Sequence, residues 1–110
     1  MSTASETAIA VLRHEIKLLT NAIQGGHTAT QGIQKSGADA LAQIEKEMNQ
    51  MLARAGVLND YNAFQKKKSE ARRKMDADLA LVRKRIEDTQ RIVDYLAMRV
   101  QHMENELREG

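Results

Sequence analysis

Apolar residues recur at alternating steps of four and three through the second half of this sequence. The positions are Met75, Leu79, Val82, Ile86, Thr89, Val93, Leu96, Val100, Met103 and Leu107, and nine of these ten are apolar. A heptad spacing sustained over this length is typical of a helix that packs along another helix in a coiled coil. The chain contains no proline that would break such a helix. We therefore predict a long helix whose seam is buried against a second helix.

The first half of the chain shows the same spacing in two shorter segments. Thr3 and Glu6 form a capping-box pattern. Behind it an apolar seam follows at steps of three and four, consisting of Ile9, Leu12, Ile16, Leu19 and Ile23. Two glycines then interrupt the pattern, and residues 25–36 favour a loop before the seam resumes at Leu41. The two seams stay in phase across this gap, so a single bent helix through the glycines is the alternative.

These segments predict one helical domain of residues 1–110. We place helices at about 4–24, 37–55 and 60–108, with a loop at 25–36 and a turn at 56–59. A turn this short makes the last helix antiparallel to the helix before it. The predicted fold is all-α without strands. It is either an elongated antiparallel helical hairpin or a three-helix bundle with coiled-coil packing.

Composition excludes several classes of protein. The absence of cysteine rules out a disulfide scaffold and a cysteine-ligated metal site, and few aromatic residues are available for a β-sandwich or barrel. No Walker loop, dinucleotide fingerprint or G-x-S-x-G elbow occurs, and the three histidines lack zinc-protease spacing. We therefore expect no enzyme activity, no catalytic or metal-binding residue and no cofactor. No signal or membrane-spanning segment is visible, so we expect a cytoplasmic protein without a membrane partner.

The strongest local feature is a group of six cations within nine residues. This basic belt consists of Lys66, Lys67, Lys68, Arg72, Arg73 and Lys74. On a helix these charges surround most of the circumference and repel one another. Either Glu45 and Glu47 on the facing helix or an acidic partner would relieve the repulsion; a purely solvated stretch is the plainer interpretation. Because the net charge is only +2 and no aromatic platform accompanies the lysines, we do not expect nucleic acid as the partner.

Several apolar residues of the predicted long helix lie outside its seam. Ile92, Tyr95 and Met98 either pack against the first helix or form an adaptable interface with a partner. Together with Leu81 they exceed what one short helix can cover. We therefore expect a homodimer or a stable complex with another protein through this part of the chain.

Part of the sequence resembles the tubulin-binding cofactor A family. The similar features are Tyr61 ahead of Lys66-Lys67-Lys68, the segment Arg83-Lys84-Arg85-Ile86-Glu87, and Asp94-Tyr95 with Arg99. This resemblance implies a monomeric or dimeric three-helix bundle that holds β-tubulin during assembly. It further implies contacts between the chain and an acidic tubulin surface.

A second resemblance is to the coiled-coil stalk proteins of flagellar and type III export systems. It is carried by two matched long helices, the second of which opens with Tyr61-Asn62-Ala63-Phe64. The sequence as a whole predicts a non-enzymatic protein-binding module, a chaperone or assembly adaptor that docks an acidic client segment on the basic belt. A coiled-coil structural or export-apparatus stalk is the alternative.

Overall fold

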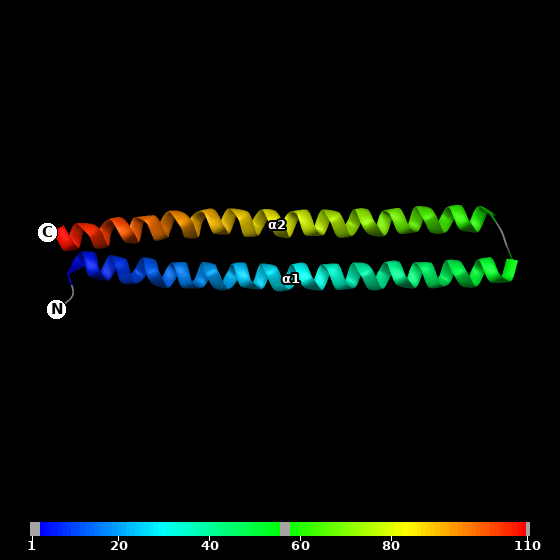
Figure 1. Cartoon of the computed structure of the whole chain (residues 1–110), viewed down its shortest axis with the longest axis horizontal. Coiled ribbons are helices and arrows are strands. Elements are labelled where there is room, and N and C mark those ends of the chain that lie inside the picture. Colours follow the sequence, from blue (N-terminus) through cyan, green and yellow to red (C-terminus); the bar gives the residue numbers. More distant parts are fainter. Residues whose placement is uncertain (1–2, 56–57, 110) are drawn as a thin grey trace. The chain divides into compact units, whose positions relative to one another are not determined.

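Two long helices account for nearly all of the chain in a computed structural model, which describes residues 3–55 and 58–109 (Figure 1). Helix α1 spans Ala4–Ala55 and helix α2 spans Leu58–Glu109, with 52 residues each. No strand occurs within the described residues. Over the same residues, neither helix contains a stretch of the length and hydropathy needed to cross a membrane. The predicted all-α fold is confirmed.

Helix α1 begins with the predicted capping box. The Glu6 backbone N–H donates to Thr3 Oγ1 at 3.1 Å, and the Thr3 backbone N–H donates to Glu6 Oε2 at 3.3 Å. The Thr3 carbonyl in turn accepts the backbone N–H of Thr7 at 3.0 Å. The two capping-box bonds satisfy N–H groups at the start of the helix that have no partner inside it, and the Thr7 bond is the first backbone bond of the helix itself. The helix therefore begins where the sequence predicts.

Residues 25–36 are helical, so the predicted loop is wrong and the alternative of one helix through the glycines is correct. The seam of α1 continues across this stretch, where Gly26, Thr30, Ile33 and Gly37 are half-buried at the same steps of three and four. A glycine inside a helix costs only about 1 kcal/mol relative to alanine. The seams before and after the glycines are in phase, so an unbroken α1 keeps its apolar contacts with α2. A break would lose more free energy from these contacts than the glycines cost in helix propensity.

Helix α2 begins within the range predicted as the turn at 56–59. Residues 56 and 57 lie outside the described part of the chain, and residues 58 and 59 belong to α2. Helix α2 therefore begins before the predicted start at residue 60. It ends at Glu109 instead of residue 108.

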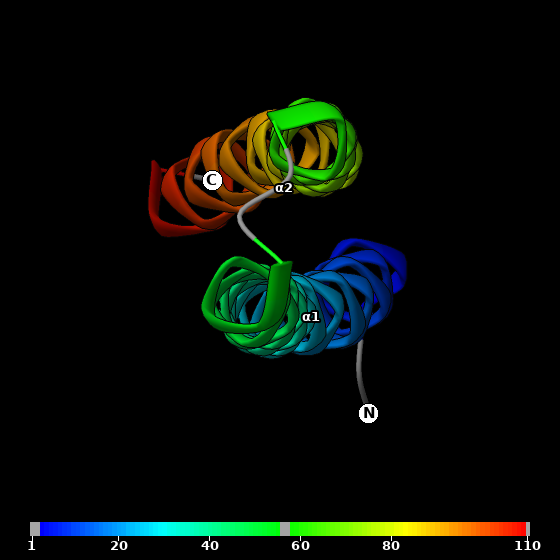
Figure 2. The same cartoon turned by 90° about the vertical axis from the view of Figure 1, so that its right-hand side faces the viewer.

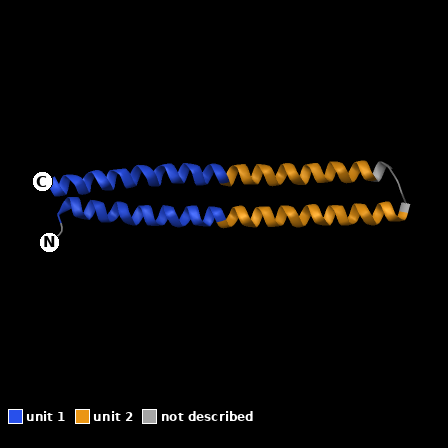
Figure 3. Ribbon diagram, in the orientation of Figure 1, with its two compact units in different colours: residues 1–27, 83–110 blue, residues 28–82 orange. Residues whose placement is uncertain are grey.

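The helices contribute segments to two compact units, shown in Figure 3. Unit 1 consists of Met1–His27 and Arg83–Gly110, and unit 2 consists of Thr28–Val82. In unit 1, Arg13 pairs with Glu104, and a Cβ on Gly26 would approach Ile86 Cγ1 to 2.7 Å. From the first of these contacts to the second, the residue number rises in α1 and falls in α2, so the two segments run antiparallel. That the whole chain is one domain stays a prediction.

Unit 2 is an antiparallel helical hairpin in its own right. Gly37 of α1 lies against Met75 of α2, and further along Glu45 pairs with Lys68. In each unit the two helix segments lie side by side, as the end-on view in Figure 2 shows. This is the helical hairpin pairing that the sequence predicts.

Each unit has a thin core. Ile9 and Val100 of unit 1 are 6% and 7% exposed, and Ile44 and Leu79 of unit 2 are 8% and 6% exposed. No other described apolar side chain is buried to this degree. The predicted seam on α2 is buried or half-buried at every position except Leu107, which is 39% exposed. Leu107 lies in the last turn of α2, where little of α1 remains to cover it.

Candidate functional site: the basic belt

The basic belt lies in unit 2, on the early turns of α2. Lys68 stands at a seam position between Phe64 and Ala71, where a coiled coil ordinarily places an apolar residue. Its side chain is 18% exposed, whereas that of Lys67 is 60% exposed. A lysine is tolerated there because its aliphatic stem packs along the seam while its ammonium group reaches a partner at the edge.

Two cations of the belt are paired with carboxylates of α1. Lys68 Nζ lies 2.6 Å from Glu45 Oε1, and Lys67 Nζ lies 3.7 Å from Glu47 Oε2. These are the two carboxylates that the sequence offers for relieving the repulsion within the belt, and both pairings are confirmed. The side of the belt that faces α1 is thus partly neutralised within the chain.

The Lys68 ammonium holds the pKa of Glu45 below its ordinary value. The hydrogen bond that Lys68 donates is the main cause, its charge is the next, and the charge of Arg72 adds a smaller effect. Because the pKa of Glu45 is lower in the folded chain than in the unfolded chain, ionised Glu45 stabilises the fold above the unfolded pKa. That stabilisation is lost as the pH falls through the folded pKa.

We expect Glu45→Gln to reduce the free energy of unfolding at neutral pH and to make it less dependent on pH in the acid range. The glutamine takes up no proton, so the difference between variant and wild type should shrink as the pH falls. Thermal unfolding followed by circular dichroism over a series of pH values measures this. Glu47→Gln is the matched control, with a smaller expected effect because its ion pair is longer. A constant difference at every pH would contradict the assignment.

The other four cations of the belt are exposed. Lys66, Arg72, Arg73 and Lys74 form no ion pair within the part of the chain that the structure describes. Lys66 and Arg73 are seven residues apart, which places them two turns apart on one stripe of α2. Neither residue is next to a seam position, so this stripe faces away from α1. The belt therefore presents a positive outer face.

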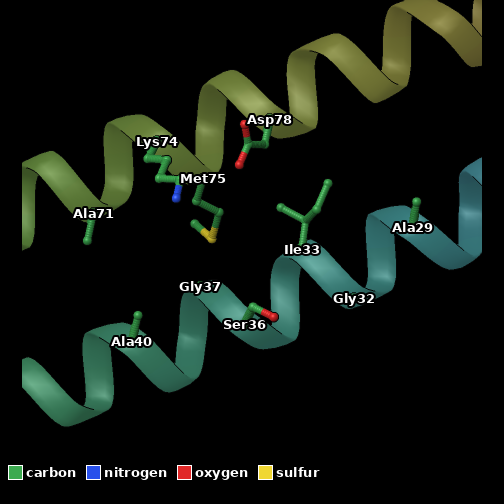
Figure 4. Close-up of a pocket in the computed structure, with 10 residues that line it drawn as sticks. All are labelled: Ala29, Gly32, Ile33, Ser36, Gly37, Ala40, Ala71, Lys74, Met75 and Asp78. Atoms are coloured by element: carbon green, nitrogen blue, oxygen red, sulfur yellow. The ribbon is translucent and has the colours of Figure 1, made fainter.

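A groove of about 510 Å³ lies beside the belt in unit 2 (Figure 4). Its α1 wall consists mainly of small residues, and Met75 of α2 reaches into the space that Gly37 leaves open. Lys74 and Asp78 add one charge of each sign on the α2 side. The sequence did not indicate this groove, because its α1 wall falls largely on the stretch predicted as a loop.

The three predicted interface residues lie in unit 1 and are exposed. Ile92 is 49%, Tyr95 54% and Met98 66% exposed, so none of them is covered by α1. In the α1 segment of unit 1, the sequence did not identify two exposed apolar residues: Val11 is 63% and Leu18 50% exposed. Their spacing of seven residues is the signal that could have identified a second apolar stripe on α1.

Comparisons with known proteins provide no relative for this chain. No family model matches the sequence, and no curated protein or solved structure matches it. In the described ranges, no three His, Asp or Glu side chains lie close enough together to hold a metal ion. A functional proposal for the chain depends on the chemistry of its own surfaces.

Proposed function

We propose that this chain is a non-enzymatic protein-binding module, a chaperone or assembly adaptor that docks an acidic client segment on the basic belt. The main support is that four of the six belt cations remain exposed and unpaired within the described residues after α1 has supplied Glu45 and Glu47. Like charges held this close on one helix repel one another. Carboxylates of a client would relieve that repulsion and gain charge-assisted hydrogen bonds.

The outer stripe of the belt defines the client contact. Lys66 and Arg73 are about 10 Å apart along the helix axis, so acidic residues two helical turns apart on a client would reach both. Arg73 can bind a carboxylate through two parallel N–H groups, and Lys66 offers a compact charge. Lys67 and Lys68 contribute less because their charges already meet Glu47 and Glu45.

We expect the double variant Lys66→Glu with Arg73→Glu to lose client binding while keeping its helicity. Pull-down with the full chain as bait, read by mass spectrometry at low and moderate salt, should show partners of the wild type that salt and this variant both remove. The control is Lys84→Glu with Arg91→Glu, which makes the same charge change at the same spacing on the same helix. Recovery of the same partners with both double variants would overturn the proposal.

The resemblance to tubulin-binding cofactor A favours an acidic tubulin surface as the client, in the cytoplasm. Purified tubulin is therefore the first client to test in a direct titration against wild type and the belt variant. Oligonucleotides serve as the competing ligand in the same titration. A nucleic-acid binder would show log affinity falling linearly with log salt for mixed sequences.

A structural role is the second candidate, as a coiled-coil stalk or export-apparatus scaffold. The observation that favours it is the equal length of the two helices, 52 residues each, with seams that pair in both units. In a scaffold the charges of the basic belt would bind no client. It would therefore retain its assembly partners in the Lys66→Glu, Arg73→Glu variant.

A further inference from the structure

The seam of unit 1 is flanked by one edge on each side, and along one of these edges an ion pair connects α1 with α2. Arg13 directly follows the seam residue Leu12, Glu104 directly follows the seam residue Met103, and the two side chains pair. In an antiparallel pair of helices, residues that follow seam positions therefore meet at one edge. Residues that directly precede seam positions lie about 100° back around each helix and share the opposite edge.

The opposite edge of unit 1 is apolar and open. Val11 and Leu18 precede the seam residues of α1 at 12 and 19, and Ile92 and Tyr95 precede those of α2 at 93 and 96. These four residues form the apolar edge, and each is about half exposed or more. At roughly 100 Å² per side chain they expose about 400 Å², which is as much as the largest patch on a typical monomer. It also approaches the apolar part of the roughly 800 Å² that each partner buries in a stable interface.

Beside these apolar residues the same edge carries an unpaired charge on each helix, and Arg85, which precedes the seam residue Ile86, adds a further exposed cation farther along the α2 segment of unit 1. Glu15 precedes the seam residue Ile16 of α1, and Arg99 precedes the seam residue Val100 of α2. Both side chains are exposed, and neither forms an ion pair within the residues that the structure describes. The edge thus offers an acid on α1 and a base on α2, so a second identical edge is complementary to it in charge.

We propose that a second copy of this chain covers the apolar edge of unit 1, with α1 of each copy lying along α2 of the other. Within unit 1, Arg13 is level with Glu104 and Gly26 with Ile86, so residues 15–18 are level with residues 95–99. A two-fold axis parallel to the helices places each residue of the second copy at the same height as the same residue of the first copy, so the same residues of α1 and α2 are level between the copies. Glu15 then meets Arg99 of the second copy, and Leu18 meets Tyr95 of the second copy.

The resulting dimer is a four-helix arrangement in which every neighbouring pair of helices is antiparallel, as in a four-helix bundle. Both copies use the same surface, which closes the assembly at two chains. Met98 is two positions from its nearest seam residues, so it stays outside the interface although the sequence predicted it as an interface residue. The dimer uses none of the belt residues, and its test is therefore independent of the proposed client binding.

The first experiment compares the full-length wild type with two single variants by sedimentation equilibrium over a range of concentrations. The wild type should be a dimer, and Leu18→Glu should raise the dissociation constant about 100-fold or more, because a carboxylate would be buried without a partner. Met98→Glu is the matched control, since Met98 is more exposed than Leu18, and it should remain dimeric. Circular dichroism confirms that both variants are helical. A wild type that stays monomeric at high concentration, or a dimer lost only in Met98→Glu, overturns the proposal.

The second experiment tests the pairing between copies. Glu15→Arg alone and Arg99→Glu alone should each weaken the dimer, because each homodimer then places like charges together twice. An equal mixture of the two variants should restore it, because both contacts of the mixed dimer join opposite charges. A pairing of Glu15 with Arg99 inside one chain would not be restored by mixing. A mixture as monomeric as the separate variants therefore overturns the proposed arrangement.

Discussion

Replacing Leu79 by alanine should lower the free energy of unfolding by about 2–5 kcal/mol, because it removes a buried side chain that the thin core cannot replace. Leu79 is 6% exposed, and among the described residues only Ile44 accompanies it in the core of unit 2. Domains of this size are stable by only about 5–15 kcal/mol in total. Urea denaturation followed by circular dichroism measures the loss.

Leu81→Ala provides the matched control for this experiment. Leu81 lies on the same helix two residues away and is 52% exposed, so the same truncation there should change the free energy of unfolding by only about 0.5 kcal/mol. Equal losses at Leu79 and Leu81 would show that the seam of unit 2 is not the core that the structure describes.

Gly37→Leu should destabilise the chain by about 1–3 kcal/mol, because the Met75 side chain already fills the space beside Gly37. A Cβ at Gly37 would collide with Met75 Sδ and lie 2.9 Å from Met75 Cγ. The expected decrease appears as a lower midpoint in thermal unfolding. Adding Met75→Ala should recover part of the loss, since the two side chains compete for the same space.

Gly32→Leu is the control, and its effect should have the opposite sign. A Cβ at Gly32 has no neighbour within 4 Å, so the substitution adds a good helix former without a collision. It should leave stability unchanged or raise it by up to about 1 kcal/mol. A similar loss at both glycines would mean that the space beside Met75 is not what restricts residue 37.

The parts of the fold that the sequence predicts are those with a local or strictly periodic cause. The capping box of Thr3 and Glu6 needs only residues three positions apart, and the seam of α2 repeats without interruption. The predicted loop at 25–36 failed for a physical reason. Glycine lowers helix propensity by a fixed local amount, but the benefit of continuing α1 comes from α2, whose facing residues are about 40 to 60 positions away in the sequence.

The candidate site was predictable in composition but not in detail. The cations of the basic belt are adjacent in the sequence, so their grouping is certain. Which of them are neutralised depends on how α1 and α2 are aligned, and this alignment selects Lys67 and Lys68. The apolar edge was missed for a similar reason, since Val11 and Leu18 become significant only when Ile92 and Tyr95 are seen on the same side of unit 1.

Lys68 and Glu45 have a consequence for how the chain finds its native pairing. A seam that repeats every seven residues allows one helix to slide past the other by a whole heptad and still bury apolar side chains. In unit 2 such a slide toward the end of α1 would move the Lys68 ammonium from Glu45 to the neighbourhood of residues 51–52, where no residue carries a carboxylate. A half-buried ammonium without a partner is costly, so this shifted pairing is penalised. The lysine that weakens the seam locally thus protects the hairpin against this mispairing.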